Sequence, residues 1–165
     1  MNFKCYDVVE IQGKRYVVTE VISYQEFIKE KTVNYTLNDE MYNNELGTHK
    51  GAKNWTEYGL MPVDGEDKKW LTIVNGEKDY CTFSETVLRS TPPKGYKLYD
   101  KGLQRVISVK GESKARSGDK ADYKEYRTIK NDKTYVFFME DWHGGLKDQA
   151  QGERIRLSDV HRRRD

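Results

Sequence analysis

Residues 15–24 read Arg-Tyr-Val-Val-Thr-Glu-Val-Ile-Ser-Tyr, a run dense in β-branched and aromatic side chains. Such side chains fit the pleated, half-buried surface of a sheet, so this run predicts a strand. The same character returns along the chain with a period of two rather than 3.6. Further strands are predicted at residues 32–37, 55–61, 69–74, 80–88, 96–109, 120–126, 135–140 and 154–157.

Turn signals separate these runs. Asn75-Gly76 predicts a two-residue hairpin turn, and Asn131-Asp132 predicts a second turn. Residues 91–95, Thr-Pro-Pro-Lys-Gly, cannot continue a ladder and predict a linker. No segment keeps a helical stripe. We therefore expect an all-β, mainly antiparallel fold with few or no helices. The best places for a helix are 25–30 and 38–46, and 47–53 has the composition of a surface loop.

An internal repeat divides the chain into two halves. Trp55-Thr56-Glu57-Tyr58 resembles Tyr123-Lys124-Glu125-Tyr126 at an offset of 68, and residues 70–74 resemble 135–139 at an offset of 65. One β-meander of this length has a single apolar face and cannot bury it alone. The sequence therefore predicts two pseudo-repeated β-meanders, residues 1–91 and 94–165 with a linker at 91–95. We expect them to form one compact unit, either a sandwich or a barrel.

Composition narrows the function classes. The chain has 165 residues, with 29 basic and 27 acidic side chains and a formal net charge of +2. This balance gives no field strong enough to imply a nucleic-acid partner. We find no signal peptide and no apolar run of roughly 20 residues, so we expect a cytoplasmic protein without a transmembrane segment. Cys5 and Cys81 fit no disulfide framework or metal motif, and we expect reduced, semi-buried thiols.

Several short motifs are spread over roughly residues 5–160. They are Trp-x-Glu-Tyr followed by Trp-Leu within residues 55–71, Val109-Lys110-Gly111-Glu112, Gly118-Asp119 with Asp122-Tyr123, and Glu140-Asp141-Trp142-His143-Gly144. Together they resemble an uncharacterised bacterial family, domain-of-unknown-function family 4178. This chain departs from the family pattern at Trp142-His143, where a tyrosine is expected. The resemblance implies a bacterial, cytoplasmic, β-rich protein of a membrane-stress-associated system, and it carries over no catalytic or binding residue.

The residues with chemistry are few. The histidines, His49, His143 and His161, lie in distant segments without metal-ligand spacing, so we expect no metal and no cofactor. Glu57 and Glu125 hold equivalent places in the two repeats. Strand alternation puts Glu57 on the same face as Trp55, and Glu125 on the same face as Tyr123. If those faces are buried, the two carboxylates could serve as acid and base. Otherwise each carboxylate faces solvent beside a cross-strand lysine.

These observations favour a non-enzymatic binding or scaffold module that recognises a protein partner or an extended ligand. One alternative is an enzyme that uses Glu57, Glu125 and His143 in a concave pocket. A second is a weak single-stranded nucleic-acid binder, although the balanced charge argues against it. The partner and the oligomeric state are left open. The candidate recognition surface is Trp55, Tyr58, Trp70, Tyr126 and Trp142. The competing interpretation is that these rings are core aromatics, and it is strongest for Trp55 and Trp70.

Overall fold

The computed structural model describes residues 2–29, 47–48 and 53–163. Within them the fold is antiparallel β with one short 3-10 segment, η3 (Leu157–Asp159). The all-β fold class is confirmed. The strands are β1 (Val8–Ile11), β2 (Lys14–Lys29), β3 (Gly47–Thr48), β4 (Asn54–Pro62), β5 (Lys69–Val74), β6 (Tyr80–Thr86), β7 (Lys97–Gly111), β8 (Lys120–Lys130), β9 (Lys133–Trp142), β10 (Lys147–Arg156) and β11 (Val160–Arg163).

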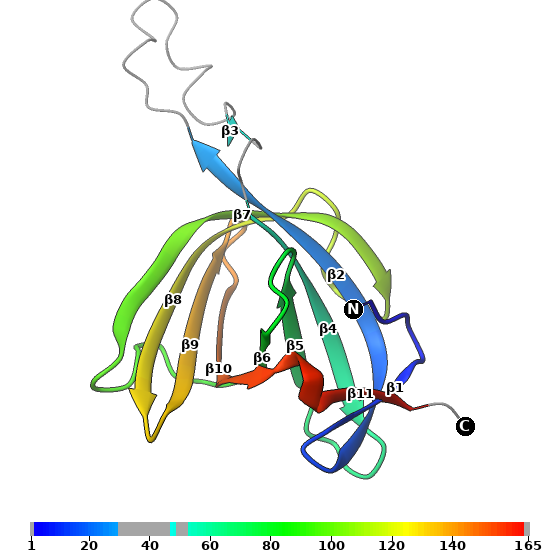
Figure 1. The fold of residues 1–165 in the computed structure, drawn as a ribbon. Helices are drawn as coiled ribbons and strands as arrows, with labels where there is room; N and C mark the ends of the chain where they lie inside the picture. Colours follow the sequence, from blue (N-terminus) through cyan, green and yellow to red (C-terminus); the bar gives the residue numbers. More distant parts are fainter. Residues whose placement is uncertain (1, 30–46, 49–52, 164–165) are drawn as a thin grey trace, which may run out of the picture.

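Eight of these strands close into a barrel, in the order β2-β4-β5-β6-β10-β9-β8-β7 (Figure 1). The ring closes because β7 pairs with β2 and β10 pairs with β6. Each seam joins a strand before the linker at 91–95 to a strand after it. Of the two architectures that the sequence left open, the chain adopts the barrel.

A β-bulge at Thr19 redirects the side chains of β2. Val18 pairs with Leu60 of β4 and Glu20 pairs with the next residue, Gly59, so Thr19 is the extra residue. An extra residue bends a strand and exchanges its two faces. Before the bulge, Tyr16 and Val18 belong to an apolar cluster outside the barrel. After it, the residues of the same parity, Glu20, Ile22 and Tyr24, face the interior.

The main apolar core lies outside the barrel wall. The residues of β4, β5 and β6 that point away from the interior pack under β1, η3 and β11, which cover this side of the wall. β1 and β11 pair with each other and lie side by side (Figure 1). Fully burying one such side chain contributes roughly 1.5–3 kcal/mol to folding. The cluster consists of Phe3, Val9, Ile11, Tyr16, Val18, Tyr58, Leu60, Leu71, Ile73, Cys81, Phe83, Leu157 and Val160.

Some sequence expectations need correction. The helix considered at 25–30 is wrong for residues 25–29, which continue β2 and pair with β7 or β3. The connection after β5 spans 75–79 rather than two residues, although Gly76 adopts the expected turn conformation with a φ of 90°. Residues 47–48 form a strand rather than loop. The sequence also missed β1, β11 and most of β10, where only residues 154–157 were predicted as a strand. The predictions for 32–37 and 38–46 lie outside the described residues.

Candidate functional site

The inside of the barrel holds a cavity of about 1010 Å³. The chain has three tryptophans, Trp55, Trp70 and Trp142, and all of them line this cavity. Because side chains alternate along a strand, each strand of the wall faces the cavity with one set of residues and the outer core with the other. Along β5, for example, Trp70 and Thr72 face the cavity, whereas Leu71 between them belongs to the outer core. The inner face is therefore a mixture of aromatic and polar side chains.

An aromatic cluster joins opposite walls of the barrel. Tyr24 of β2 stacks on Trp55 of β4, with ring centroids 5.7 Å apart and an interplanar angle of 16°. Its ring also lies 6.5 Å from that of Trp142 of β9. Trp55 also meets Tyr123 of β8 edge to face, with ring centroids 5.7 Å apart. Rings that interlock in this way hold one another in fixed orientations.

Two carboxylates lie inside the barrel beside this cluster. Glu57 lies within reach of the Tyr24 hydroxyl, which donates to Oε1 at 3.4 Å. Glu140 accepts a hydrogen bond from Nε2 of the buried Gln104. Both carboxylates line the cavity and keep part of their surface open to it, although protein surrounds them. Neither forms an ion pair with a residue in the described part of the chain.

The pKa values of both groups reflect this setting. Burial is the largest cause that raises the pKa of Glu57 well above its ordinary value, and the charges of Glu140 and Glu20 raise it further. The Tyr24 hydrogen bond and the charge of Lys68 act in the opposite direction. Burial also raises the pKa of Glu140 to about 7, against the effect of Gln104. The barrel thus encloses two carboxylates whose negative charges are poorly compensated.

A third interior carboxylate has a cation of its own. Glu20 is 2% exposed and forms an ion pair with Lys68. The Lys68 ammonium also lies over the Trp70 ring, 4.2 Å from its centroid. Gly59 leaves room for the Glu20 side chain, because a Cβ at position 59 would lie 2.5 Å from Glu20 Cγ.

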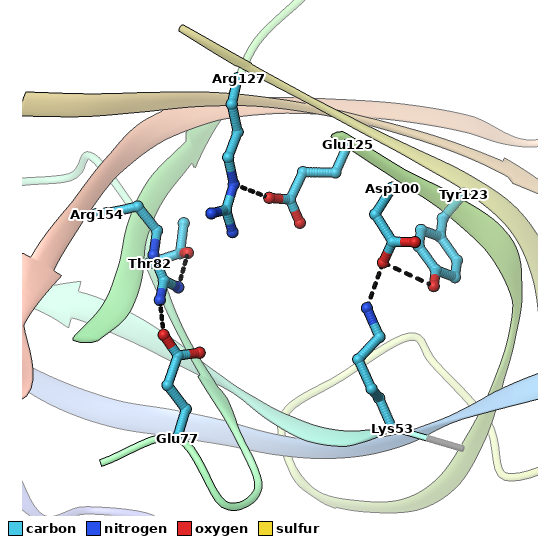
Figure 2. A network of polar contacts seen from close by, with 8 residues as sticks. All are labelled: Lys53, Glu77, Thr82, Asp100, Tyr123, Glu125, Arg127 and Arg154. Carbon is cyan, nitrogen blue, oxygen red and sulfur yellow. Dashed lines mark hydrogen bonds and ion pairs between the residues drawn. The ribbon is translucent and has the colours of Figure 1, made fainter. Parts of the chain in front are cut away.

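A second polar network occupies another part of the interior (Figure 2). Arg127 of β8 donates from Nε to Glu125, and Arg154 of β10 donates to Glu77 and, at 3.0 Å, to Thr82. Figure 2 shows these side chains projecting inside the ring of strands. Burial raises the pKa of Glu125, whereas Arg127 lowers it. The cations of this network are already matched with carboxylates.

The same view contains Lys53, which directly precedes β4, together with Asp100 of β7 and Tyr123 of β8. Lys53 forms an ion pair with Asp100 of β7. The Tyr123 hydroxyl lies 2.7 Å from Glu26 Oε2 and 3.2 Å from Asp100 Oδ2, so two carboxylates share its one proton. Burial is the main cause that raises the pKa of Tyr123 far above its ordinary value.

Several sequence-predicted residues meet in this cavity. Trp55, Trp70 and Trp142 line it, as do Glu57 and Glu125. The shared faces of Trp55 with Glu57 and of Tyr123 with Glu125 are confirmed. The carboxylates whose charges raise the pKa of Glu57 are Glu140 and Glu20. The use of Glu57 and Glu125 as an acid–base pair stays a prediction. His143 also lines the cavity, in the turn after β9, and lies 3.3 Å from the exposed Asp122.

Two of the predicted binding residues lie elsewhere. Tyr58 is 2% exposed and packs edge to face on Phe3 in the outer core, so it is a core aromatic. Tyr126 pairs with Phe137 across strands β8 and β9, on the outer face, and their ring centroids are 6.5 Å apart. Both follow from alternation, because each is adjacent to an inward-facing glutamate.

Sequence reasoning also missed functional candidates. Tyr24, Glu20, Gln104 and Glu140 all line the cavity, yet none of them was selected. Glu20 and Tyr24 both lie in the strand predicted at residues 15–24, and their even spacing, which puts them on one face, was the available signal. Glu140-x-Trp142 repeats the spacing of Trp55-x-Glu57 in reverse order. No comparable signal marks Gln104.

Neither cysteine forms a disulfide bond. Cys81 is buried in the outer core, and burial raises the pKa of its thiol to about 12. Cys5 is half-buried, and both thiols are free. Among residues 2–29, 47–48 and 53–163, no three His, Cys, Asp or Glu side chains converge as metal ligands would. The described segments contain no helix of the length and apolarity that a membrane span requires.

Comparison with protein-family models, with curated proteins and with solved structures finds no match for this chain. The resemblance to domain-of-unknown-function family 4178 therefore stays a prediction, as does the bacterial, cytoplasmic setting that it implies.

Proposed function

We propose that this protein is a binding module that holds a small molecule inside its barrel. The observation that carries the proposal is the cavity of about 1010 Å³ lined by every tryptophan of the chain. Eight-stranded barrels are wide enough to hold one small ligand, and ligand sites in proteins combine aromatic walls with a few placed polar groups. The module is thus of the binding class that the sequence favours, with its aromatic surface turned inward.

The position of the hydrophobic core supports this proposal. In a barrel stabilised from within, apolar side chains fill the interior. Here the outer cluster around Tyr58, Leu71 and Phe83 takes that part, and the inner face carries charged and polar groups. Buried polar groups are costly to folding unless they are satisfied. A function that uses them accounts for their presence.

The test is a binding screen with intrinsic tryptophan fluorescence, because all three indole rings of the chain line the cavity. Panels of small cationic, anionic and neutral compounds are added to the purified protein, and thermal shifts are recorded in parallel. We expect at least one class to bind the wild type. Thr72→Phe, which adds a ring to the inner face, should abolish that binding. Gln151→Phe places the same ring on the exposed outer face and should leave binding unchanged.

Far-UV circular dichroism shows whether Thr72→Phe has folded, and Val74→Phe, also on the cavity wall, is the second blocking variant. The proposal is overturned if no compound in the panels binds. It is also overturned if folded Thr72→Phe and Val74→Phe bind as well as the wild type, because the ligand then lies outside the barrel.

A second candidate function is acid–base catalysis in the same cavity. It is favoured by Glu57, whose enclosed carboxyl has a raised pKa and therefore suits a proton donor. Its partner is Glu140 rather than Glu125. Glu57→Gln separates the two functions once a ligand is known. A binding module keeps the ligand chemically intact in both proteins, whereas an enzyme converts it in the wild type only.

A further inference from the structure

Two strands on opposite walls carry the same pair of residues. In β4, Trp55 and Glu57 are two positions apart and face the cavity, and in β9 Glu140 and Trp142 do the same. Tyr24 of β2 lies between these pairs, because its ring contacts both tryptophans and its hydroxyl reaches Glu57. The aromatic–carboxylate cage consists of Tyr24, Trp55, Glu57, Glu140 and Trp142.

The charges around this cage do not balance. The described cavity lining contains eight Asp or Glu side chains and five Lys or Arg side chains. Lys53, Lys68 and Arg127 pair with Asp100, Glu20 and Glu125, and Arg154 pairs with Glu77. These pairs use four of the five cations of the lining. None of the four forms an ion pair with Glu57 or Glu140, and only the charge of Lys68 is felt at Glu57, where it lowers the pKa. Glu57 and Glu140 have only neutral hydrogen-bond partners, Tyr24 and Gln104, in the part of the chain that the structure describes.

Enclosed carboxylates beside aromatic faces are the setting in which proteins hold ammonium groups. The negative face of an aromatic ring attracts a cation, most strongly once the cation is removed from water. A carboxylate supplies the opposite charge, and an uncompensated carboxylate in such a place is costly without one. The cage presents three rings and two carboxylates to one region of the cavity.

Building on the proposed small-molecule binding, we propose that the ligand is an organic ammonium ion whose cationic head lies in the aromatic–carboxylate cage. Its apolar part then lies along the cavity wall toward Ile22 and Trp70, which belong to the same interior cluster. Burial is the largest cause of the raised pKa values of Glu57 and Glu140, and neighbouring carboxylates add to it, Glu140 and Glu20 for Glu57 and Asp148 for Glu140. A cation in the cage would offset these negative charges.

An anionic ligand fits the interior less well. Its best site would be the pair of arginines, but Arg127 already faces Glu125 and Arg154 already faces Glu77 (Figure 2). An anion there would have to displace a carboxylate and would also meet the remaining acidic lining. The charge pattern thus separates a cationic ligand from an anionic one.

The experiment uses probes that differ in charge but not in shape. Choline and 3,3-dimethylbutan-1-ol have the same outline, and only the first is a cation. Butylammonium and butyrate extend the series to a primary amine and an anion. Each is titrated into the full-length protein by tryptophan fluorescence and calorimetry. We expect an ammonium probe to bind about tenfold more tightly than its neutral counterpart, a ratio within the range of cation–π and charge contributions.

Variants locate the charge. The double variant Glu57→Gln/Glu140→Gln should lose about tenfold in ammonium affinity and leave binding of the neutral alcohol unchanged. Glu66→Gln removes one carboxylate from an exposed loop and should change neither. If the double variant fails to fold, the single variants Glu57→Gln and Glu140→Gln replace it. Retention of full ammonium affinity in the folded variants overturns the inference.

The outcomes also separate this inference from the proposed function. If butyrate or the neutral alcohol binds the wild type, and Thr72→Phe abolishes that binding, the cavity binds small molecules. If the ammonium probes bind no better than these compounds, the cationic ligand is overturned and the proposed function stands. If no probe of any charge binds, and the wider screen is also negative, both are overturned.

Discussion

Gly59 shows how one residue can set the position of an interior charge. Its backbone φ is not in the left-handed region, so the reason for a glycine here is space rather than conformation. Glu20 lies directly opposite on β2 and its side chain crosses the position that a Cβ would take. We regard Gly59 as a positioning residue for the Glu20–Lys68 ion pair.

This role predicts that the loss of stability caused by Gly59→Ala depends on the presence of Glu20. Gly59→Ala should destabilise the protein by roughly 1–3 kcal/mol, because the Glu20 side chain must move. In a Glu20→Ala background the same change should cost less than about 0.5 kcal/mol, since nothing remains to collide with. Urea unfolding of the four proteins measures both values as a double-mutant cycle. Equal costs in the two backgrounds would show that the glycine has another role.

Glu140 makes stability depend on pH. Its pKa lies near 4.5 in the unfolded chain and is raised to about 7 in the barrel. The folded protein therefore binds more protons than the unfolded one across this window. Stability is highest below about pH 4.5 as far as this group is concerned, and it falls as the pH rises to 7. A shift of this size corresponds to roughly 3 kcal/mol.

The predicted outcome is a smaller pH effect in Glu140→Gln than in the wild type when unfolding free energies are compared at pH 5 and pH 8. The amide keeps an oxygen for the Gln104 hydrogen bond but has no proton to lose. Glu66→Gln serves as the control and should behave as the wild type does. An unchanged pH dependence in Glu140→Gln would place the titrating group elsewhere.

Among the individual residues of the site, the sequence could identify about half. Trp55 with Glu57 was found because both lie in one strand, where a period of two is a local rule. That Glu140 joins them from β9 depends on which strands lie opposite each other across the closed barrel. Local patterns do not contain this information. The position of Tyr58, by contrast, could be predicted locally, because the same alternation puts it on the face opposite Glu57.

Among the elements, the hairpin between β8 and β9 has the tightest turn requirement. Its two central residues, Asn131 and Asp132, have φ values of 51° and 64°. Two positive values are typical of a type I′ turn, which matches the twist of the adjoining strands. Asn and Asp tolerate this conformation better than other non-glycine residues do.

Asn131→Ala should therefore destabilise the protein by about 1 kcal/mol. Asn75→Ala is the matched change in the connection between β5 and β6, where Asn75 does not have a positive φ, and it should cost less. Thermal unfolding followed by circular dichroism compares the two. An equal or smaller loss for Asn131→Ala would mean that the turn relaxes into another conformation.

The strands themselves were largely predictable, and the exceptions have physical causes. β4 to β9 follow from alternation and turn chemistry, both of which are local. β1 and β11 have four residues each, too few for a periodic pattern to stand out. The end of β2 was considered as a helix because its sequence is ambiguous, and its pairing with β7 and β3 determines the outcome.

The predicted repeat illustrates the limit of matching one strand to another. The structure pairs Glu57 with Thr72 and Glu125 with Phe138, which relates the second strands at an offset of 66. The sequence alignment uses 65, and it matches Leu71 of the outer core with Val136, which pairs with the inward-facing Arg127. A slip of one residue exchanges the two faces of a strand. The repeat remains a prediction.

In the molecule as a whole, the main apolar core lies outside the barrel wall, and the cavity with its polar and aromatic lining lies inside it. This is the reverse of a barrel whose interior is filled by apolar side chains. Leu71 and Thr72 are neighbours in β5, yet the first belongs to the dry outer core and the second to the cavity. Leu71→Ala should cost roughly 2–5 kcal/mol, because it leaves a void among packed side chains. Thr72→Ala should cost less than about 1 kcal/mol, since it only enlarges an existing cavity.

Urea unfolding of the two single variants measures this difference. Comparable losses would indicate that the interior contributes packing energy to the same extent as the outer cluster. The outer cluster would then not be the main source of packing energy in this fold.

The pairing of Val8 with Arg163 and of β6 with β10 has a consequence for how the chain reaches its native state. Neither the ring nor the layer that covers it can be completed before the last strands are available. A nascent chain that lacks residues 147–163 therefore presents β6 and β1 as open edges and the outer core without Leu157 and Val160. Contacts between such distant parts of a chain slow the search for the native state and prolong exposure to aggregation. We expect folding of this barrel to wait until residues 147–163 have been synthesised, and then to take about milliseconds to seconds.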